Sequence, residues 1–305
     1  MNPDFTRALA ASGELAASPL VVMDVGALGG FNPRWEHFGV HMRAIGFEPQ
    51  GQQVVGERQS VYPFAIGRQR GMGQIHIARS PFLSSFLPVA QSWRDRSCVF
   101  HGNAEVVRVE EIPLIDIDSF CDEFAIDRVD FLKIDTEGTE LDVLEGAART
   151  LDRSVLGIEI EVFFHETHPG RAVFAEIDAW MRGKGFTLFD LTPWRFCKTA
   201  LPNLDETRHG KSVHGQVVGG DALYLRDPIA GQGIGAGLTP AALAKLVALM
   251  ELWDMRDCAF ELLQWAGARG QLSPTLLGWA DLLVPPVLGR RVSNEVYQQL
   301  AKVFG

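Results

Sequence analysis

A strand that ends in an acid and a glycine turn, followed by a second strand that also ends in an acid, most constrains the fold of this chain. The apolar run 20–25 contains Asp24 and is followed by the closely spaced Gly26 and Gly29, and the next apolar run ends at Glu48. This order is the layout of a nucleotide-type ligand site at the carboxyl edge of a parallel sheet. Glycines let the backbone approach a ligand, and the second carboxylate can accept hydrogen bonds from ribose hydroxyls.

The rest of the chain alternates between strand-like and helix-like patterns. Several strand-like runs are continuously apolar, which is typical of parallel strands covered by helices on both faces. Seven segments are predicted as strands: 20–25, 44–48, 61–66, 129–134, 155–162, 186–190 and 222–226. Helical patterns lie between them, at 32–38, 140–151 and 172–184. We therefore predict an α/β fold with a doubly wound, mostly parallel, seven-stranded Rossmann-like sheet.

Two regions depart from this alternation. Residues 67–120 hold two alternating strand patterns and a loop with a short helix, and this insertion can form a lid over the ligand crevice. Residues 229–238 contain four glycines and read as a flexible linker, and a helical appendage follows. The predicted organisation is a ligand-binding domain at 1–228, a linker at 229–238 and an appendage at 239–305.

Composition excludes several classes of protein. The net charge is −10 and no basic cluster is present, which argues against a nucleic-acid partner. The four cysteines form no Cys-x-x-Cys pair, so neither a zinc site nor a disulfide framework is indicated. The sequence shows neither a secretory signal pattern nor an apolar stretch long enough for a membrane span. We expect a cytoplasmic protein.

The glycine pattern favours one cofactor over another. A nicotinamide dinucleotide site shows Gly-x-Gly-x-x-Gly after the first strand, whereas this chain has Asp24 two residues ahead of Gly26. A carboxylate there would repel a pyrophosphate. S-adenosylmethionine carries a sulfonium and an α-ammonium and no phosphate, so it fits this acidic turn better.

Several segments together resemble the FkbM-type S-adenosylmethionine-dependent methyltransferases. They are DVGALGG at 24–30, GFEP at 46–49, FLKIDTEGTELDVLEGA at 131–147, IEIEVFF at 158–164, GFTLFDL at 185–191 and GGDALYLRD at 219–227. The resemblance spans residues 19–227 and leaves the tail uncovered. It implies a class I methyltransferase fold and O-methylation of sugars or other hydroxyl-bearing metabolites.

The resemblance also implies roles for individual residues. Asp24, Gly26 and Gly29 would form the wall beside the methionine part of the cofactor. Glu48 would hold the ribose hydroxyls, since a carboxylate is a sufficient bidentate acceptor. Ala65 and Ile66 would flank the adenine.

Four side chains are candidates for activating a hydroxyl acceptor, which must lose its proton to a base or a metal. His165 is the predicted general base. Asp135 can act as base, orient the acceptor or bind a metal, or it can cap the helix that follows. A divalent metal held by Asp135 and His168 remains an alternative, although no metal motif is present, and Glu137 is predicted to be structural, at the positive end of that helix.

The partners and the rival functions follow from the same features. The expected acceptor is a hydroxyl-bearing small molecule or a glycan precursor. The apolar tail helices are predicted to pack within the chain or to form a homodimer. The rival functions are a non-catalytic, methyltransferase-like scaffold within a biosynthetic complex and, less favoured by the glycine spacing, a nicotinamide-dependent oxidoreductase.

Overall fold

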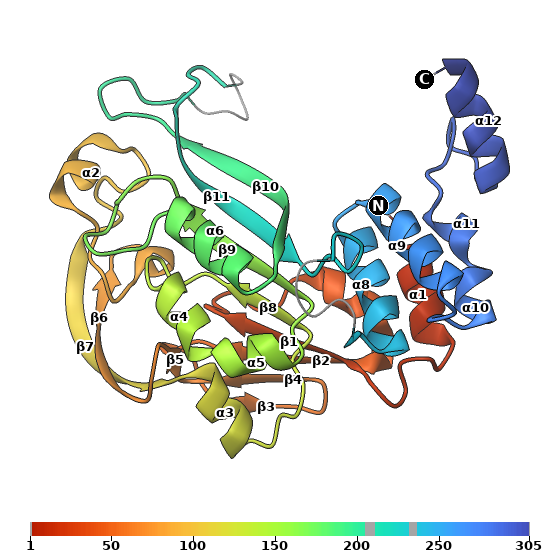
Figure 1. Cartoon of the computed structure of the whole chain (residues 1–305). Helices are drawn as coiled ribbons and strands as arrows, with labels where there is room; N and C mark the ends of the chain where they lie inside the picture. The colour runs from red at the N-terminus through yellow and green to blue at the C-terminus, as the bar shows by residue number, and fades with distance from the viewer. Residues whose placement is uncertain (1, 205–210, 232–236, 305) are drawn as a thin grey trace. The chain divides into compact units, whose positions relative to one another are not determined.

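A computed structural model describes residues 2–204, 211–231 and 237–304 of the chain (Figure 1). The chain forms two compact units, one made of residues 1–22, 31–44 and 226–305 and the other of residues 23–30 and 45–225. The predicted glycine-rich linker at 229–238 includes residues 232–236, which lie outside the described residues. Within the described ranges, no helix combines the length and the apolar character that crossing a bilayer requires.

The central sheet has eight strands, where the sequence predicts seven. Their order is β10 (Thr187–Phe196), β11 (Gln216–Leu225), β9 (Gly157–Phe163), β8 (Phe131–Ile134), β1 (Leu20–Val25), β2 (Met42–Phe47), β4 (Gln59–Tyr62) and β3 (Val54–Val55). Strands β8 and β9 are parallel. Strand β11 is antiparallel to both β9 and β10, and β3 is antiparallel to β4. The α/β prediction is confirmed, but the sheet is mixed and one strand larger.

The extra strand is β3, and the single strand predicted at 61–66 is divided between two sheets. The segment breaks after Tyr62, because Pro63 has no backbone N–H to give to a sheet. Strand β4 therefore ends in the central sheet, and β5 (Ala65–Ile66) joins a second sheet. The short hairpin partner β3 brings the central sheet to eight strands.

The inserted region forms the second sheet and several short helices. Strand β7 (Val106–Ile115) lies between β5 and β6 (Gly71–Ala78), parallel to the first and antiparallel to the second. Two short helices, η2 (Pro81–Leu83) and α2 (Gln91–Arg96), follow β6, and α3 (Ile117–Glu123) follows β7. The predicted strand patterns and loop helix are present in this region.

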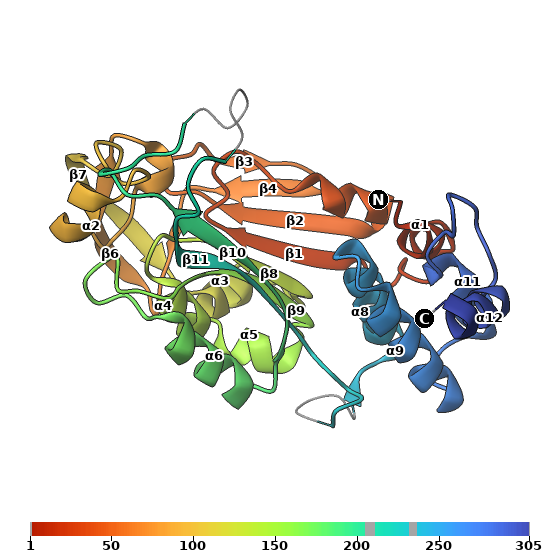
Figure 2. The same ribbon diagram turned by 90° about the horizontal axis from the view of Figure 1, so that it is seen from above.

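Three helices lie on one face of the central sheet, as the two views agree (Figures 1 and 2). They are α4 (Glu140–Gly146), α5 (Ala148–Arg153) and α6 (Phe174–Gly183). The first two replace the single helix predicted at 140–151, because the chain leaves helical geometry at Ala147. Gly146 lies so close to the Gly67 carbonyl oxygen that a Cβ would stand 2.2 Å from it. Helix α4 begins directly beyond the carboxyl end of β8 and so positions the residues between them.

The other unit is mostly helical and contains the tail. Its elements are α1 (Asp4–Ala11), η1 (Pro33–His41), α8 (Pro240–Leu252), α9 (Arg256–Ala268), α10 (Pro274–Leu277), α11 (Ala280–Leu283) and α12 (Asn294–Phe304). Every residue of α8 from Ala242 to Glu251 is buried. The ring of Trp279 lies 6.2 Å from Phe5, and that of Trp253 lies 5.8 Å from Trp35. Trp253 and Trp279 of the tail therefore pack against segments from the amino-terminal part of the chain.

Candidate functional site

The glycine turn after β1 is held between the ends of two other strands. Gly26 and Ala27 each donate a backbone hydrogen bond to the Phe47 carbonyl oxygen, at 3.1 Å. Asp135 N donates to the Val25 carbonyl oxygen at 3.0 Å. Gly26 has a φ of +85°, and a Cβ there would lie 1.9 Å from the Asp135 carbonyl oxygen. Only glycine fits this approach of two backbones.

A cavity of about 270 Å³ opens at this edge of the sheet. This volume lies near the lower limit for small-molecule pockets. Its lining comes from the β1 turn, the end of β2, β5, the η2 loop and the residues after β8, and it includes Gly26, Glu48, Ala65, Ile66, Phe82, Phe86, Lys133, Asp135 and Glu137. The structure thus brings five of the predicted site residues together around one cavity. Asp24, Gly29, His165 and His168 are outside its lining.

Glu48 presents a buried carboxylate to the cavity. Its residue is 8% exposed, and Oε1 accepts a hydrogen bond from Gln50 N at 2.9 Å. Among the described residues, no other hydrogen bond reaches this carboxylate. Ala65 and Ile66, which are 4% and 3% exposed, add an apolar wall to the same cavity.

Lys133 links the acidic residues at the ends of β1 and β8. Its Nζ donates to Asp135 Oδ2 at 2.9 Å and to the Gly26 carbonyl oxygen at 3.4 Å, and it lies 3.6 Å from Asp24 Oδ1. Burial raises the pKa of Asp24 to about 6, although Lys133 opposes the shift. Asp24 therefore lies behind the turn, outside the cavity lining. It is linked to the cavity by its ion pair with Lys133, which is part of that lining.

Three carboxylates converge beside Lys133. Ligand atoms of Asp135, Glu137 and Glu161 all lie within 4.8 Å of one another. Burial, followed by the charge of Asp135, raises the pKa of Glu137 to about 8. Burial, followed by the charge of Glu137, raises the pKa of Glu161 well above its usual range. The Oε2 atoms of Glu137 and Glu161 are buried and have no hydrogen-bond partner.

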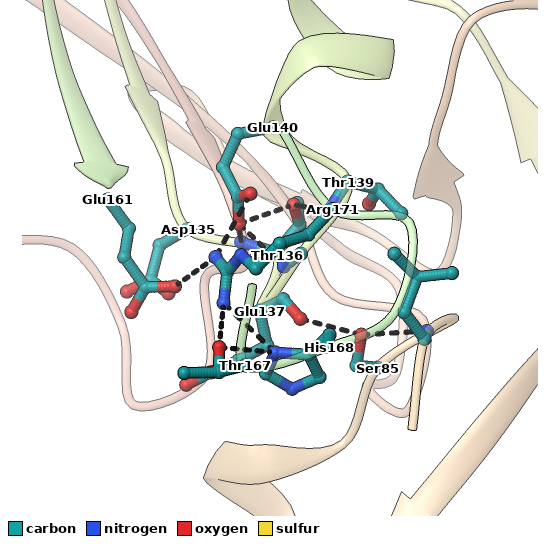
Figure 3. Close-up of polar contacts among 12 residues, drawn as sticks. Ser85, Asp135, Thr136, Glu137, Thr139, Glu140, Glu161, Thr167, His168 and Arg171 are labelled. Atoms are coloured by element: carbon teal, nitrogen blue, oxygen red, sulfur yellow. Dashed lines mark hydrogen bonds and ion pairs between the residues drawn. The ribbon is translucent and has the colours of Figure 1, made fainter. Parts of the chain in front are cut away.

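A second network fixes the turn that carries Asp135 and Glu137 (Figure 3). Glu140 Oε1 accepts hydrogen bonds from Gly138 N at 2.8 Å and from Thr136 Oγ1 at 3.1 Å. Arg171 forms an ion pair with Glu140 Oε2 at 3.3 Å. Both side chains are fully buried. Because Glu140 accepts from the turn and Arg171 pairs with Glu140, the turn is held rigidly from behind.

The two histidines lie outside the cavity lining. His168 is fully buried, its Nδ1 lies 2.9 Å from Arg171 Nη1, and burial with the Arg171 charge lowers its pKa to about 3. His165 Nε2 lies 3.2 Å from the Val217 carbonyl oxygen and 3.0 Å from Gln216 Nε2. His165, the predicted general base, and His168, the alternative metal ligand, therefore both contact neighbouring protein groups and do not line the cavity.

Sequence reasoning missed Arg171 and Glu140 as parts of this site. Arg171 stands in a loop after β9, where a charged residue is ordinarily solvated, and Glu140 reads as an acid in the first turn of a helix. Ser85 Oγ donates to the Glu137 carbonyl oxygen at 2.8 Å, a contact between residues 52 positions apart. The one available signal was the high density of acids at the ends of β8 and β9.

Comparison with known proteins identifies the family. Residues 24–188 match the Methyltransferase FkbM domain, which is more than half of the chain. No curated protein matches the sequence. The solved structure of magnesium protoporphyrin IX methyltransferase (ChlM) from Synechocystis PCC 6803 with bound SAM is 9% identical, covering 73% of this chain and 80% of that chain, with a TM-score of 0.28. So low a TM-score gives that likeness no weight, and the domain match alone shows that the chain belongs to the FkbM methyltransferase family.

Proposed function

We propose that the protein is an S-adenosylmethionine-dependent O-methyltransferase acting on a hydroxyl of a sugar, a glycan precursor or a related metabolite. Membership of a methyltransferase family supports the reaction class. The observation that carries the choice of cofactor is the buried carboxylate of Glu48, which lines the same cavity as the Gly26 turn and the apolar β5 wall.

The residues around the cavity fit the three parts of this cofactor. Glu48 accepts one backbone hydrogen bond and has acceptor capacity left for ribose hydroxyls. Ala65 and Ile66 offer an apolar surface to the adenine. The Gly26 turn after β1, with Asp24 behind it, suits the cationic methionine part. When bound, S-adenosylmethionine supplies a methyl group that its sulfonium has already activated.

Asp135 is the group that we propose accepts the proton of the acceptor hydroxyl. Its carboxylate lines the cavity with a side chain that is 38% exposed. Lys133 pairs with it at 2.9 Å and so orients it. Holding the acceptor oxygen in line with the methyl group supplies much of the acceleration in such a displacement. The rigid turn behind Asp135 serves this positioning.

His165 also remains a prediction for the general base. Variants of His165 and of Asp135 distinguish between these two residues. Because His165 contacts β11 rather than the cavity, we expect His165→Ala to keep most of its turnover. Asp135→Asn is expected to lose turnover, since removing a general base lowers the rate roughly 10²- to 10⁴-fold. The affinity of this variant for the cofactor should stay within about threefold of the wild type. The reverse result would assign the base to His165.

The choice of a sugar-like acceptor rests on the family resemblance and on two rings at the cavity. Phe82, which is 66% exposed, and Phe86 both line it. Exposed rings give a surface against which the apolar face of a sugar can pack. Transfer of a labelled methyl group to a panel of sugar, amine and carboxylate acceptors tests this choice. Label found only on amines or carboxylates would contradict it.

Calorimetric titration with S-adenosylhomocysteine tests the proposed cofactor. We expect one site per chain, no binding of NAD⁺, and a Glu48→Gln variant that binds about 10- to 100-fold more weakly, the cost of hydrogen bonds to a charged group. Glu57→Gln is the matched control, because Glu57 is exposed and outside the cavity lining. Absence of binding to the wild type, or equal affinity in the two variants, would contradict the proposal.

A further inference from the structure

The acidic cluster beside the cavity comes from two neighbouring strands and the turn after one of them. Strands β8 and β9 pair in parallel, with Ile134 opposite Ile160. The next residues along each strand, Asp135 and Glu161, therefore lie side by side, as Figure 3 shows. Glu137 follows in the turn, and ligand oxygens of all three lie within 4.8 Å of one another.

Two of these carboxylates hold a buried oxygen without a hydrogen bond, and only Glu161 has an ion-pair partner, Arg171 at 3.6 Å. Glu161 is 6% exposed, and its Oε2 has no hydrogen bond. The Oε2 of Glu137 is also buried without a hydrogen bond. A buried polar atom left unsatisfied costs about 1–3 kcal/mol, and more when it is charged. A ligand that supplies positive charge would remove this cost.

The cations of the protein do not balance the cluster. Five acids meet here: Asp24, Asp135, Glu137, Glu140 and Glu161. Lys133 contacts Asp24 and Asp135, and Arg171 contacts Glu140 at 3.3 Å and Glu161 at 3.6 Å. Within the described part of the chain, no ion pair reaches Glu137. Glu137 is therefore the carboxyl group of this cluster that neither cation contacts.

The ligand set and its spacing suit a hard divalent cation. Carboxylate oxygens are the ligands that Mg²⁺, Mn²⁺ and Ca²⁺ prefer. Ligands on opposite sides of such an ion lie twice the metal–oxygen distance apart, about 4.2 Å for Mg²⁺ and about 4.6–5.2 Å for Ca²⁺. The three carboxylates already fall within this span.

We propose that Asp135, Glu137 and Glu161 form a binding site for a divalent cation at the wall of the cavity. Asp135 and Glu137 also line the cavity, so the cation lies where an acceptor can reach it. A cation there stabilises the alkoxide form of an acceptor hydroxyl and helps Asp135 to orient it. This catalytic role rests on the proposed methyltransferase function, whereas binding of the cation does not.

Binding of Mn²⁺ to the full-length protein, after dialysis against a chelator, tests the site. The electron paramagnetic resonance signal of free Mn²⁺ falls as the ion binds, so the titration counts sites without measuring activity. We expect one site per chain in the wild type and at least tenfold weaker binding in Glu161→Gln and in Glu137→Gln. Glu111→Gln is the matched control, because Glu111 is exposed on β7 and should leave binding unchanged.

The variants and a parallel titration with S-adenosylhomocysteine distinguish failure of the cation site from failure of the proposed function. Both substitutions are nearly isosteric, and Glu137→Gln provides the test if Glu161→Gln does not fold. No Mn²⁺ bound at millimolar concentration, or equal binding in all four proteins, would overturn the site. S-adenosylhomocysteine binding without Mn²⁺ binding refutes the cation site alone. Mn²⁺ binding without S-adenosylhomocysteine binding refutes the proposed function and leaves the cation site standing.

Discussion

Buried carboxylates in the two units of the chain differ in how fully they are hydrogen-bonded. Glu251 of α8 is fully buried and accepts hydrogen bonds from Phe5 N at 3.1 Å, Thr6 N at 2.8 Å and Thr6 Oγ1 at 2.7 Å. Glu137 and Glu161, in the other unit, each keep a buried oxygen without a hydrogen bond. Because natural proteins pair nearly all buried polar groups, unpaired ones indicate a function.

The contrast also separates structural residues from ligand-binding ones. Helix α1 has Pro3 at its N-cap position and no side-chain cap of its own. Glu251 provides the missing acceptor from a residue more than 240 positions away. Its carboxylate therefore stabilises the fold, whereas Glu137 and Glu161 beside the cavity each hold a buried oxygen that no described donor hydrogen-bonds.

The largest expected effect tests this contrast through stability. Glu251→Ala leaves two buried backbone donors, Phe5 N and Thr6 N, without their acceptor and should lower the free energy of unfolding by about 4 kcal/mol. Glu137→Ala removes a carboxylate that no described donor contacts, so it should cost less than about 1 kcal/mol. Denaturant unfolding monitored by circular dichroism measures both. Equal losses would show that the two carboxylates are structurally equivalent.

A pair of glycines on the β1 turn gives the next largest effect. Gly26→Ala places a Cβ 1.9 Å from the Asp135 carbonyl oxygen at a φ of +85°, and we expect a loss of about 3–4 kcal/mol. Gly29→Ala is the matched control, because its φ is also positive, at +94°, but no atom lies within 4 Å. That control should lose about 1–2 kcal/mol. Similar melting temperatures for the two variants would contradict the close backbone approach.

The raised pKa of Asp24 predicts a pH dependence of stability. With a pKa of about 6 in the folded state against 3.8 as its ordinary value, Asp24 binds more protons folded than unfolded between these limits. Stability from this group is therefore present at low pH and is lost as the pH rises from about 4 to about 6, by at most about 3 kcal/mol. Asp24→Asn should reduce the fall of the unfolding free energy over this window by the contribution of this one group. Parallel curves for both proteins would rule out the raised pKa.

The smallest effect concerns the contact between the inserted region and the acidic turn. Ser85 Oγ donates to the Glu137 carbonyl oxygen at 2.8 Å and accepts from Leu87 N at 3.0 Å. Ser85→Ala should cost about 1 kcal/mol and weaken Mn²⁺ binding by less than tenfold, since no ligand is removed. Ser84→Ala provides the comparison, because its hydroxyl accepts from Ala78 N and does not contact Glu137. Loss of Mn²⁺ binding in Ser85→Ala alone would make Ser85 essential to the turn.

Local patterns predicted the parts of the site that local chemistry determines. The need for a glycine at Gly26 and the acid at Glu48 both follow from residues close to strand ends. The break after Tyr62 was readable from Pro63 and was missed. The pairing of Glu140 with Arg171, and of Glu251 with α1, could not be predicted, because these contacts join segments that only the folded chain brings together.

The most direct test of the central claim is a crystal structure of the protein grown with S-adenosylhomocysteine and Mn²⁺, with diffraction recorded at the manganese absorption edge. The account predicts nucleoside density between the Gly26 turn and Glu48, and one anomalous peak among Asp135, Glu137 and Glu161. Density for the nucleoside or the metal elsewhere in the chain, with this edge of the sheet left unchanged, would contradict it.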